Sequence, residues 1–221
     1  MQLDHLVLAA RTLADGVAWC EATLGIVPAP GGNHAFMGTH NRLFSIGSAA
    51  FPRAYFEIIA IDPAAPPPAR PRWFDLDSPA LAQALSGGPA LIHWVARCDD
   101  VHAAAAGLRA AGIDRGEVLQ AERATPRGLL RWKISLRVDG RRLLGGAAPA
   151  LIEWSDVHPT DSMPGSGIEL KKMRLGGWPD ALAPLLAPQI ECNRAPGAPP
   201  ISVVLSCPRG LVTLHGQPSE A

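Results

Sequence analysis

Four side chains in this sequence are of types that bind metal ions or transfer protons, and they occur as two similar pairs. His5 lies in the apolar run LDHLVLAA and His93 in LIHWVAR, while Glu57 lies in YFEIIAI and Glu153 in LIEWS. Burying imidazoles and carboxylates in apolar strands is costly unless they are paired or bind a metal. Two of each suit a divalent ion such as Zn, Ni, Mn or Fe and leave positions for water or a substrate. The pattern predicts a metal site formed by His5, Glu57, His93 and Glu153.

The elements that would position these residues are duplicated along the chain. When His5 is aligned with His93, each lies in a short run that is rich in apolar and β-branched residues, which is typical of a strand. A helix N-cap type follows each run, Thr12 in the first and Asp100 in the second. Apolar residues at helical spacing come next and end at a glycine, and further strands lead to the two glutamates. Each half therefore has the pattern strand–helix–strands.

The boundaries of the repeat divide the chain into four parts. The middle part is a Pro-rich connector in which Ser78 and Pro79 mark the start of a short helix packed on the surface. The last part resembles a partial copy with a hairpin near Arg209 and Gly210, and it either shields a sheet edge or extends the core. We expect a first module at 1–61, the connector at 62–89, a second module at 90–156 and a C-terminal extension at 157–221.

Composition and charge narrow the class of protein. The 221 residues are 48% hydrophobic and 18% charged, which is typical of a folded chain, and 20 Lys and Arg balance 20 Asp and Glu. A neutral chain has no general attraction for nucleic acid, and its apolar runs are too short for a membrane helix. The four scattered cysteines favour reduced thiols in a cytoplasmic protein. We expect a small-molecule substrate, no nucleic acid or membrane partner, and either a monomer or a homodimer.

A glycine-punctuated stretch, GGNHAFMGTHNRLFSIG (31–47), carries further polar candidates. Glycines let a loop approach a ligand closely. His40 is a candidate general acid or base because histidine titrates near neutral pH, and His34, Thr39 and Asn41 are candidates for binding polar substrate atoms. In the alternative interpretation, Thr39 and Asn41 stabilise a local turn by bonding to their own backbone.

Three tryptophans and one arginine lie next to these sites. Trp94 and Trp154 each follow a proposed ligand, so strand alternation predicts that they point to the opposite sheet face and pack under helices. In the strand LLRWKISL, either Trp132 or Arg131 faces the cavity, and Arg131 is a candidate for binding the substrate.

The same residues carry a resemblance to a known family. The opening LDHLVLAA, the LGI at 24–26 and the FEIIAID run resemble the glyoxalase-like, vicinal oxygen chelate superfamily, and the Gly-Thr-x-Asn-Arg-Leu part of 31–47 is similar to one glyoxalase-like subgroup. The resemblance covers residues 1–156 well and 166–221 loosely. It implies an α+β fold of paired βαβββ modules whose curved sheets enclose a cavity, with a C-terminal partial repeat.

The resemblance also implies a function. His5, Glu57, His93 and Glu153 match ligand positions around a divalent metal, and Glu153 is the carboxylate expected to transfer a proton. The expected activity is that of a metal-dependent lyase or isomerase acting on a small organic molecule with vicinal oxygens. A metal-free small-molecule binding protein and an iron-dependent, ring-cleaving dioxygenase are the alternatives, because the fold alone does not choose between them.

Overall fold

Two consecutive units of the same topology build most of the molecule. The computed structural model describes residues 1–125 and 128–218. The first unit comprises β1 (Gln2–Ala9), α1 (Leu13–Leu24), β2 (Ala29–His34), β3 (Thr39–Ser45) and β4 (Tyr55–Ile61). The second comprises β5 (Ala90–Arg97), α3 (Val101–Ala110), β6 (Glu117–Thr125), β7 (Gly128–Leu136) and β8 (Ala150–Trp154).

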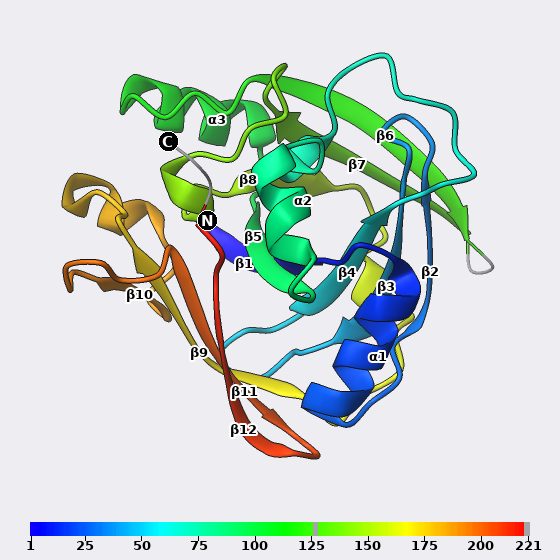
Figure 1. Ribbon diagram of the computed structural model, residues 1–221. Coiled ribbons are helices and arrows are strands. Elements are labelled where there is room, and N and C mark those ends of the chain that lie inside the picture. The colour runs from blue at the N-terminus through cyan, green and yellow to red at the C-terminus, as the bar shows by residue number, and fades with distance from the viewer. Residues whose placement is uncertain (126–127, 219–221) are drawn as a thin grey trace.

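The two units share one curved sheet with the strand order β2-β3-β4-β1-β5-β8-β7-β6 (Figure 1). Within the units, β1 pairs in parallel with β4, and β5 pairs in parallel with β8. The units join where β1 and β5 pair antiparallel at the centre of the sheet. The predicted α+β fold of paired βαβββ modules is therefore confirmed.

The helices begin and end where the sequence predicts. The Thr12 side chain accepts a hydrogen bond from the Asp15 N–H at the start of α1, and Asp100 accepts from two N–H groups at the start of α3. Gly25 ends α1 in the left-handed conformation at φ 81°, which glycine adopts without a steric cost. None of the described helices is long and apolar enough to span a membrane.

Alternation along the strands gives the sheet two apolar faces. On β1, Leu6 and Leu8 pack on the convex face with α1 and α3, whereas Val7 and Ala9 pack on the concave face. Trp94 lies in the convex core, as its position in the sequence predicts. His5 has the same parity as Val7 and therefore points to the concave side.

The sequence predicted that the connector packs on the surface. In the structure it also contributes to the concave core. The 3-10 helix η1 (Trp73–Asp75) precedes α2 (Pro79–Leu85), which Ser78 caps. Trp73 and Phe74 are 4% exposed and pack with concave-face residues of both units. This segment therefore closes one side of the interior.

The C-terminal part forms a second, smaller sheet with the strand order β10-β9-β11-β12. Its strands are β9 (Glu169–Gly176), β10 (Ile190–Asn193), β11 (Ile201–Cys207) and β12 (Gly210–His215), and its 3-10 helices are η3 (Pro159–Asp161) and η4 (Asp180–Leu185). A further 3-10 helix, η2 (Leu144–Gly146), precedes β8 in the second unit. Buried residues such as Met173 and Val203 join the convex core. The extension thus enlarges the core, which was one of the two expected roles.

Candidate functional site

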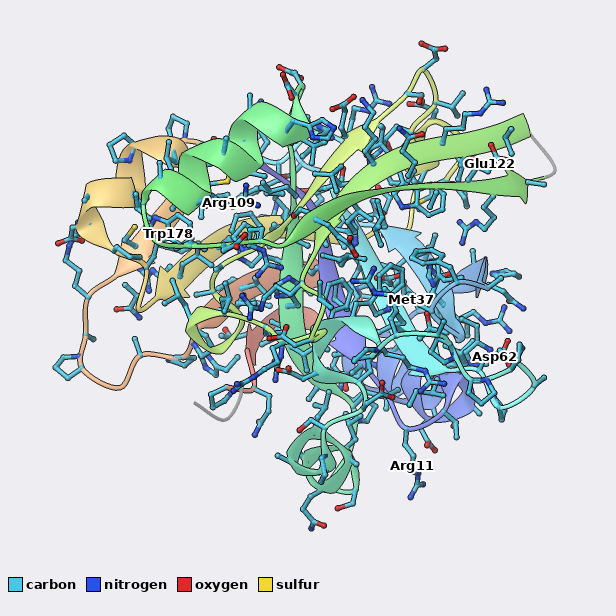
Figure 2. The ribbon with its side chains drawn as sticks, turned by 90° about the horizontal axis from the view of Figure 1, so that it is seen from above. Arg11, Met37, Asp62, Arg109, Glu122 and Trp178 are labelled. Atoms are coloured by element: carbon cyan, nitrogen blue, oxygen red, sulfur yellow. The ribbon has the colours of Figure 1, made fainter. Side chains whose placement is uncertain are left out.

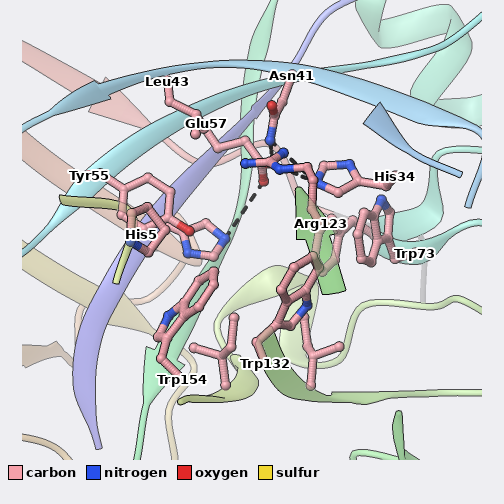
Figure 3. A pocket seen from close by; sticks show the side chains of 14 residues that line it. His5, His34, Asn41, Leu43, Tyr55, Glu57, Trp73, Arg123, Trp132 and Trp154 are labelled. Carbon is pink, nitrogen blue, oxygen red and sulfur yellow. Dashed lines mark hydrogen bonds and ion pairs between the residues drawn. The ribbon is translucent and has the colours of Figure 1, made fainter. Parts of the chain in front are cut away.

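A cavity lies on the concave side of the sheet; it opens to solvent, and its enclosed part holds about 40 Å³ (Figure 3). Its polar lining residues are His5, His34, Asn41, Tyr55, Glu57 and Arg123. Its apolar lining is mostly Trp73, Phe74, Trp132, Ile134, Ile152 and Trp154. The cavity therefore has a polar side, built mainly by the first unit, and an aromatic side, built by the connector and the second unit.

Glu57 on β4 is held in place by Asn41 on the neighbouring strand β3. The Asn41 amide donates a hydrogen bond of 2.6 Å to Glu57 Oε1 and accepts one of 2.8 Å from the Gly32 N–H. The backbone donor fixes which end of the Asn41 amide faces Glu57. A Cβ at residue 31 would lie 2.1 Å from Asn41 Oδ1, so only Gly31 leaves room for this arrangement.

His34 at the end of β2 is a neutral, buried neighbour of this pair. Its Nε2 lies 3.4 Å from the Asn41 amide nitrogen, and its Nδ1 lies 3.1 Å from the Thr39 hydroxyl. Burial, reinforced by the charge of Arg123, lowers the pKa of His34 from 6.5 to about 3. Since Asn41 Nδ2 can only donate, His34 accepts at Nε2 and carries its proton on Nδ1, toward Thr39.

His5 is oriented by a carboxylate behind it. Its Nδ1 lies 2.7 Å from Asp4 Oδ1, and Asp4 Oδ2 accepts hydrogen bonds from His158 Nε2 at 3.0 Å and Trp154 Nε1 at 3.0 Å. Burial alone would raise the pKa of Asp4, but the hydrogen bonds from His158 and His5 outweigh it and hold the pKa well below its usual range. The ionised Asp4 can only accept a hydrogen bond, so His5 carries a proton on Nδ1.

The other ring nitrogen of His5 is directed toward Glu57. His5 Nε2 lies 3.7 Å from Glu57 Oε2, which is longer than a hydrogen bond, so Nε2 faces the cavity without bonding to Glu57. The ring stacks on Tyr55 with centroids 4.5 Å apart. Burial, followed by the charges of Asp4 and Glu57, raises the pKa of Tyr55 well above its ordinary value, so its phenol stays protonated at neutral pH.

Comparison with known proteins identifies the family of the chain. The sequence pattern of the glyoxalase-like domain family matches residues 3–189. The chain belongs to the glyoxalase-like domain family. No curated protein sequence matches it.

Among solved structures, this glyoxalase-like chain is similar to a hypothetical protein from Staphylococcus aureus, with a TM-score of 0.53 and 12% identity over 100% of this chain and 87% of that one. It is also similar to methylmalonyl-CoA epimerase of Streptomyces coelicolor (TM-score 0.42, 20% identity, 72% and 97% covered). The Mycobacterium tuberculosis epimerase is similar at a TM-score of 0.39 and 17% identity, with 73% and 91% covered. The first similarity supports the fold and nothing beyond it.

The predicted four-residue metal site of this glyoxalase-like protein is not assembled. His5 and Glu57 meet in the cavity, but His93 is fully buried beside Phe74, and its Nε2 accepts a hydrogen bond of 3.0 Å from the Ala150 N–H. Burial lowers the pKa of His93 well below its ordinary value, so this ring is a neutral core residue. Within residues 1–125 and 128–218, no group of three or more His, Cys, Asp or Glu side chains could hold a metal ion. The donor set therefore does not fit the expected divalent ion.

Glu153 does not reach the cavity, because its register places it on the wrong face. Its Oε1 lies 2.7 Å from Lys133 Nζ, and its Oε2 accepts a 3.0 Å bond from the Val101 N–H at the start of α3. In the first unit, Glu57 lies two positions beyond the strand partner of His5. The register of β5 and β8 puts the equivalent position at Ala150. Because 153 differs from 150 by an odd number, Glu153 points to the opposite face.

Two further candidates lie outside the cavity. His40 points to the other face of β3 from Asn41, and its Nδ1 lies 4.0 Å from Asp62 Oδ1. The Arg131 side chain points outward from β7, is 63% exposed and pairs at 3.3 Å with Glu122, which Figure 2 labels near the far end of the two long strands. The roles predicted for His40 in catalysis and for Arg131 in substrate binding are therefore not supported by their positions.

The other candidates of the 31–47 stretch gather near Glu57. His34 and Asn41 line the cavity, and Thr39, which is 1% exposed, lies behind His34 as its hydrogen-bond partner. Trp132 faces the cavity, which settles the alternative between it and Arg131. Trp154 also lines the cavity, so its predicted position under a helix is wrong.

Sequence reasoning missed Tyr55 and Arg123 as site residues. Tyr55 pairs with His5 across β1 and β4, so it becomes a neighbour only once that register is known. Arg123 lies in the strand EVLQAERAT (117–125), two and four positions after the apolar Ala121 and Leu119. Alternation puts these three residues on one face, which indicates an inward position. That parity was a usable signal for a charged residue on a concave face.

Proposed function

We propose that this glyoxalase-like protein is an enzyme of the isomerase or lyase type that removes and returns a proton on a small organic molecule bound in the cavity. The observation that carries the proposal is the state of His5. Its Nδ1 proton is held by ionised, buried Asp4, and its Nε2 faces the cavity near Glu57; in the proposed resting state Nε2 carries no proton. A base oriented in this way can act in general acid–base catalysis.

In the proposed step, His5 Nε2 takes a proton from a carbon next to a carbonyl group of the substrate. The electron pair of the broken C–H bond moves onto the carbonyl oxygen, and the imidazolium forms between the Asp4 and Glu57 carboxylates. Both negative charges stabilise the imidazolium, and the Asn41 hydrogen bond keeps Glu57 in position. Return of the proton to the same or a different atom gives the isomerised product.

The proposed step uses the side chains of His5, Asp4 and Glu57 and needs no bound metal ion. Since the described residues do not gather a metal-binding group, we expect proton transfer to continue after chelation. Dialysis against EDTA should leave the rate within about twofold of its starting value. Loss of the rate in EDTA, with recovery on adding Zn²⁺ or Mn²⁺, would show that His5 and Glu57 act only with an ion.

The direct test is proton exchange measured by NMR. The protein is incubated in D₂O with a panel of small 2-oxo acids, hydroxyketones and malonate-type diacids, and loss of the carbon-bound proton signal is followed. His5→Gln should lower exchange by roughly 10²-fold or more, which is the usual contribution of a general base. His102→Gln is the matched control, because His102 is exposed on α3 and far from the cavity lining.

The alternative function, a small-molecule binding protein without catalysis, gives a different outcome in the same experiment. Such a protein would bind members of the panel with no exchange above the buffer rate in any of them. A wild-type rate equal to that of His5→Gln would also refute the assignment of the base. Thermal unfolding of each variant separates loss of the base from loss of the fold.

A further inference from the structure

Arg123 reaches into the cavity from the far edge of the sheet. It lies on the edge strand β6 of the second unit, whereas Glu57 and Asn41 belong to the first. Its guanidinium crosses to the opposite edge strand β2, where a Cβ at residue 32 would lie 2.5 Å from Nη1 and 2.8 Å from Cζ. Gly32 therefore leaves the space that lets Arg123 bridge the two edges. Figure 3 labels Arg123 beside His34, Asn41 and Glu57.

Part of the Arg123 guanidinium has no partner within the described residues. Nη1 is buried without a hydrogen-bond acceptor, and no described carboxylate oxygen comes within 4.0 Å of the group. The nearby carboxylate Glu57 already accepts from Asn41 and faces His5. A buried N–H without an acceptor is costly, so the position favours a ligand that brings its own negatively charged oxygen.

The wall that faces this cation is aromatic. Trp73, Trp132 and Trp154 line the cavity, and the rings of Trp132 and Trp154 lie 5.5 Å apart at 44°. Indole faces and edges favour contact with a flat ring over contact with a thin alkyl chain. The enclosed part of the cavity holds only about 40 Å³ and its mouth is open to solvent, so a ring bound here would lie partly in the mouth.

We propose that the ligand of this cavity is an aromatic carboxylate, with its carboxylate on Arg123 and its ring against the three indoles. The planar guanidinium matches a carboxylate through two parallel hydrogen bonds. A phosphate would bring two negative charges beside Glu57 and Asp4 with one lining cation to balance them, so a single-charged carboxylate suits the site better. The inference rests on the proposed function in that it names the substrate class of the same cavity.

The test compares three probes that differ in one feature each. Phenylacetate has the ring and the charge, phenylacetamide has the same shape without charge, and acetate lacks the ring. Binding is measured by titration calorimetry and by the fluorescence of the cavity tryptophans. We expect phenylacetate to bind the wild-type protein at least tenfold more tightly than either of the other two probes.

Variants then assign the selectivity to Arg123. Arg123→Gln should remove the preference for phenylacetate over phenylacetamide, while Arg131→Gln, on the outer face of the adjacent strand, should keep it. Arg123→Lys retains the charge without the planar fork and should lie between the two. It also serves as the test variant if Arg123→Gln does not fold, as judged by thermal unfolding. An unchanged preference in either Arg123 variant would overturn the proposal.

The outcome is separable from that of the proposed function. If phenylacetate binds through Arg123 but no compound of the exchange panel loses a proton, then the enzyme proposal fails and the ligand class stands. If uncharged hydroxyketones exchange protons through His5 while the charged and uncharged ring probes bind equally, then the ligand class fails and the enzyme proposal stands. Equal binding of phenylacetate and acetate would overturn the part assigned to the indoles.

Discussion

Replacing His34 by Gln should remove a large part of the acid sensitivity of the folded state. In the unfolded chain, His34 takes up a proton near its ordinary pKa of 6.5, whereas in the folded protein burial lowers that pKa to about 3. Below pH 6.5 the unfolded state therefore binds more protons than the folded state, and the free energy of unfolding falls as the pH falls. Glutamine keeps an acceptor for Asn41 and a donor for Thr39 but does not titrate.

The magnitude follows from the difference between the two pKa values. A pH of 5 is 1.5 units below the pKa of His34 in the unfolded chain, so the residue is protonated there, whereas in the folded protein it remains neutral. Each pH unit corresponds to about 1.4 kcal/mol. Between pH 7.5 and pH 5, wild type should therefore lose about 2 kcal/mol more than His34→Gln. Ionised Asp4 does not contribute in this range, because the stability from its lowered pKa is lost only as pH falls below 3.8.

The assay is urea unfolding followed by tryptophan fluorescence at both pH values. Contributions from His93, whose pKa is also lowered, occur in both proteins and cancel in the comparison. His102→Gln is the control and should follow wild type, since His102 is exposed. If wild type and His34→Gln lose the same free energy between pH 7.5 and pH 5, the reasoning that His34 is buried and neutral is refuted.

Three further substitutions test the assignments of the site and the fold. Glu153→Gln should leave proton exchange unchanged and lower the free energy of unfolding in urea by about 0.5 kcal/mol, because only a partly exposed ion pair is lost. Abolished exchange would show that Glu153 takes part in the reaction. Asp4→Asn should cost about 3 kcal/mol and lower exchange at least tenfold, since buried donors lose a charged acceptor; unchanged exchange would show that His5 needs no orienting carboxylate. Gly16→Ala should cost about 1 kcal/mol in thermal unfolding, because its Cβ would lie 2.3 Å from Ile58 Cγ2 and this overpacking outweighs the gain in helix propensity. A stabilised Gly16→Ala protein would show that α1 can shift on the sheet.

The features of the fold that local sequence determines were predictable. The caps at Thr12 and Asp100, the stop at Gly25 and the alternation in the strands depend on neighbouring residues, and the structure has them at the predicted places. The meeting of His5 with Glu57 was also accessible, since both lie in the central strands of one unit.

What the sequence could not provide is the register of strands that lie far apart in the chain. Aligning Glu153 with Glu57 by residue type ignored a displacement of three positions, and an odd displacement exchanges the two faces of a strand. The same error placed Trp154 under a helix although it faces the cavity. Arg123 enters the site through the approach of two sheet edges, and no local pattern specifies how strongly a sheet curves.

The register also explains why a duplicated fold has an unequal site. The position in the second unit that corresponds to Glu57 is Ala150. His93, the counterpart of His5, accepts a hydrogen bond from the Ala150 N–H and is therefore not available to a ligand. A small residue at position 150 leaves the second unit without a carboxylate on its concave face at this level. Its neighbours there are instead Ile152 and Trp154.

Two equivalent units facing one cavity would present the same chemistry twice, which suits a central ion held by both. Here the polar residues that orient a proton belong mainly to the first unit, while the connector and the second unit supply the aromatic wall and the second unit supplies the cation Arg123. A ligand that spans this cavity must therefore differ at its two ends. In the proposed complex the reacting atom lies at His5 and the ring lies against the indoles of the connector and the second unit, so one substrate would need both units although only the first holds the proposed base.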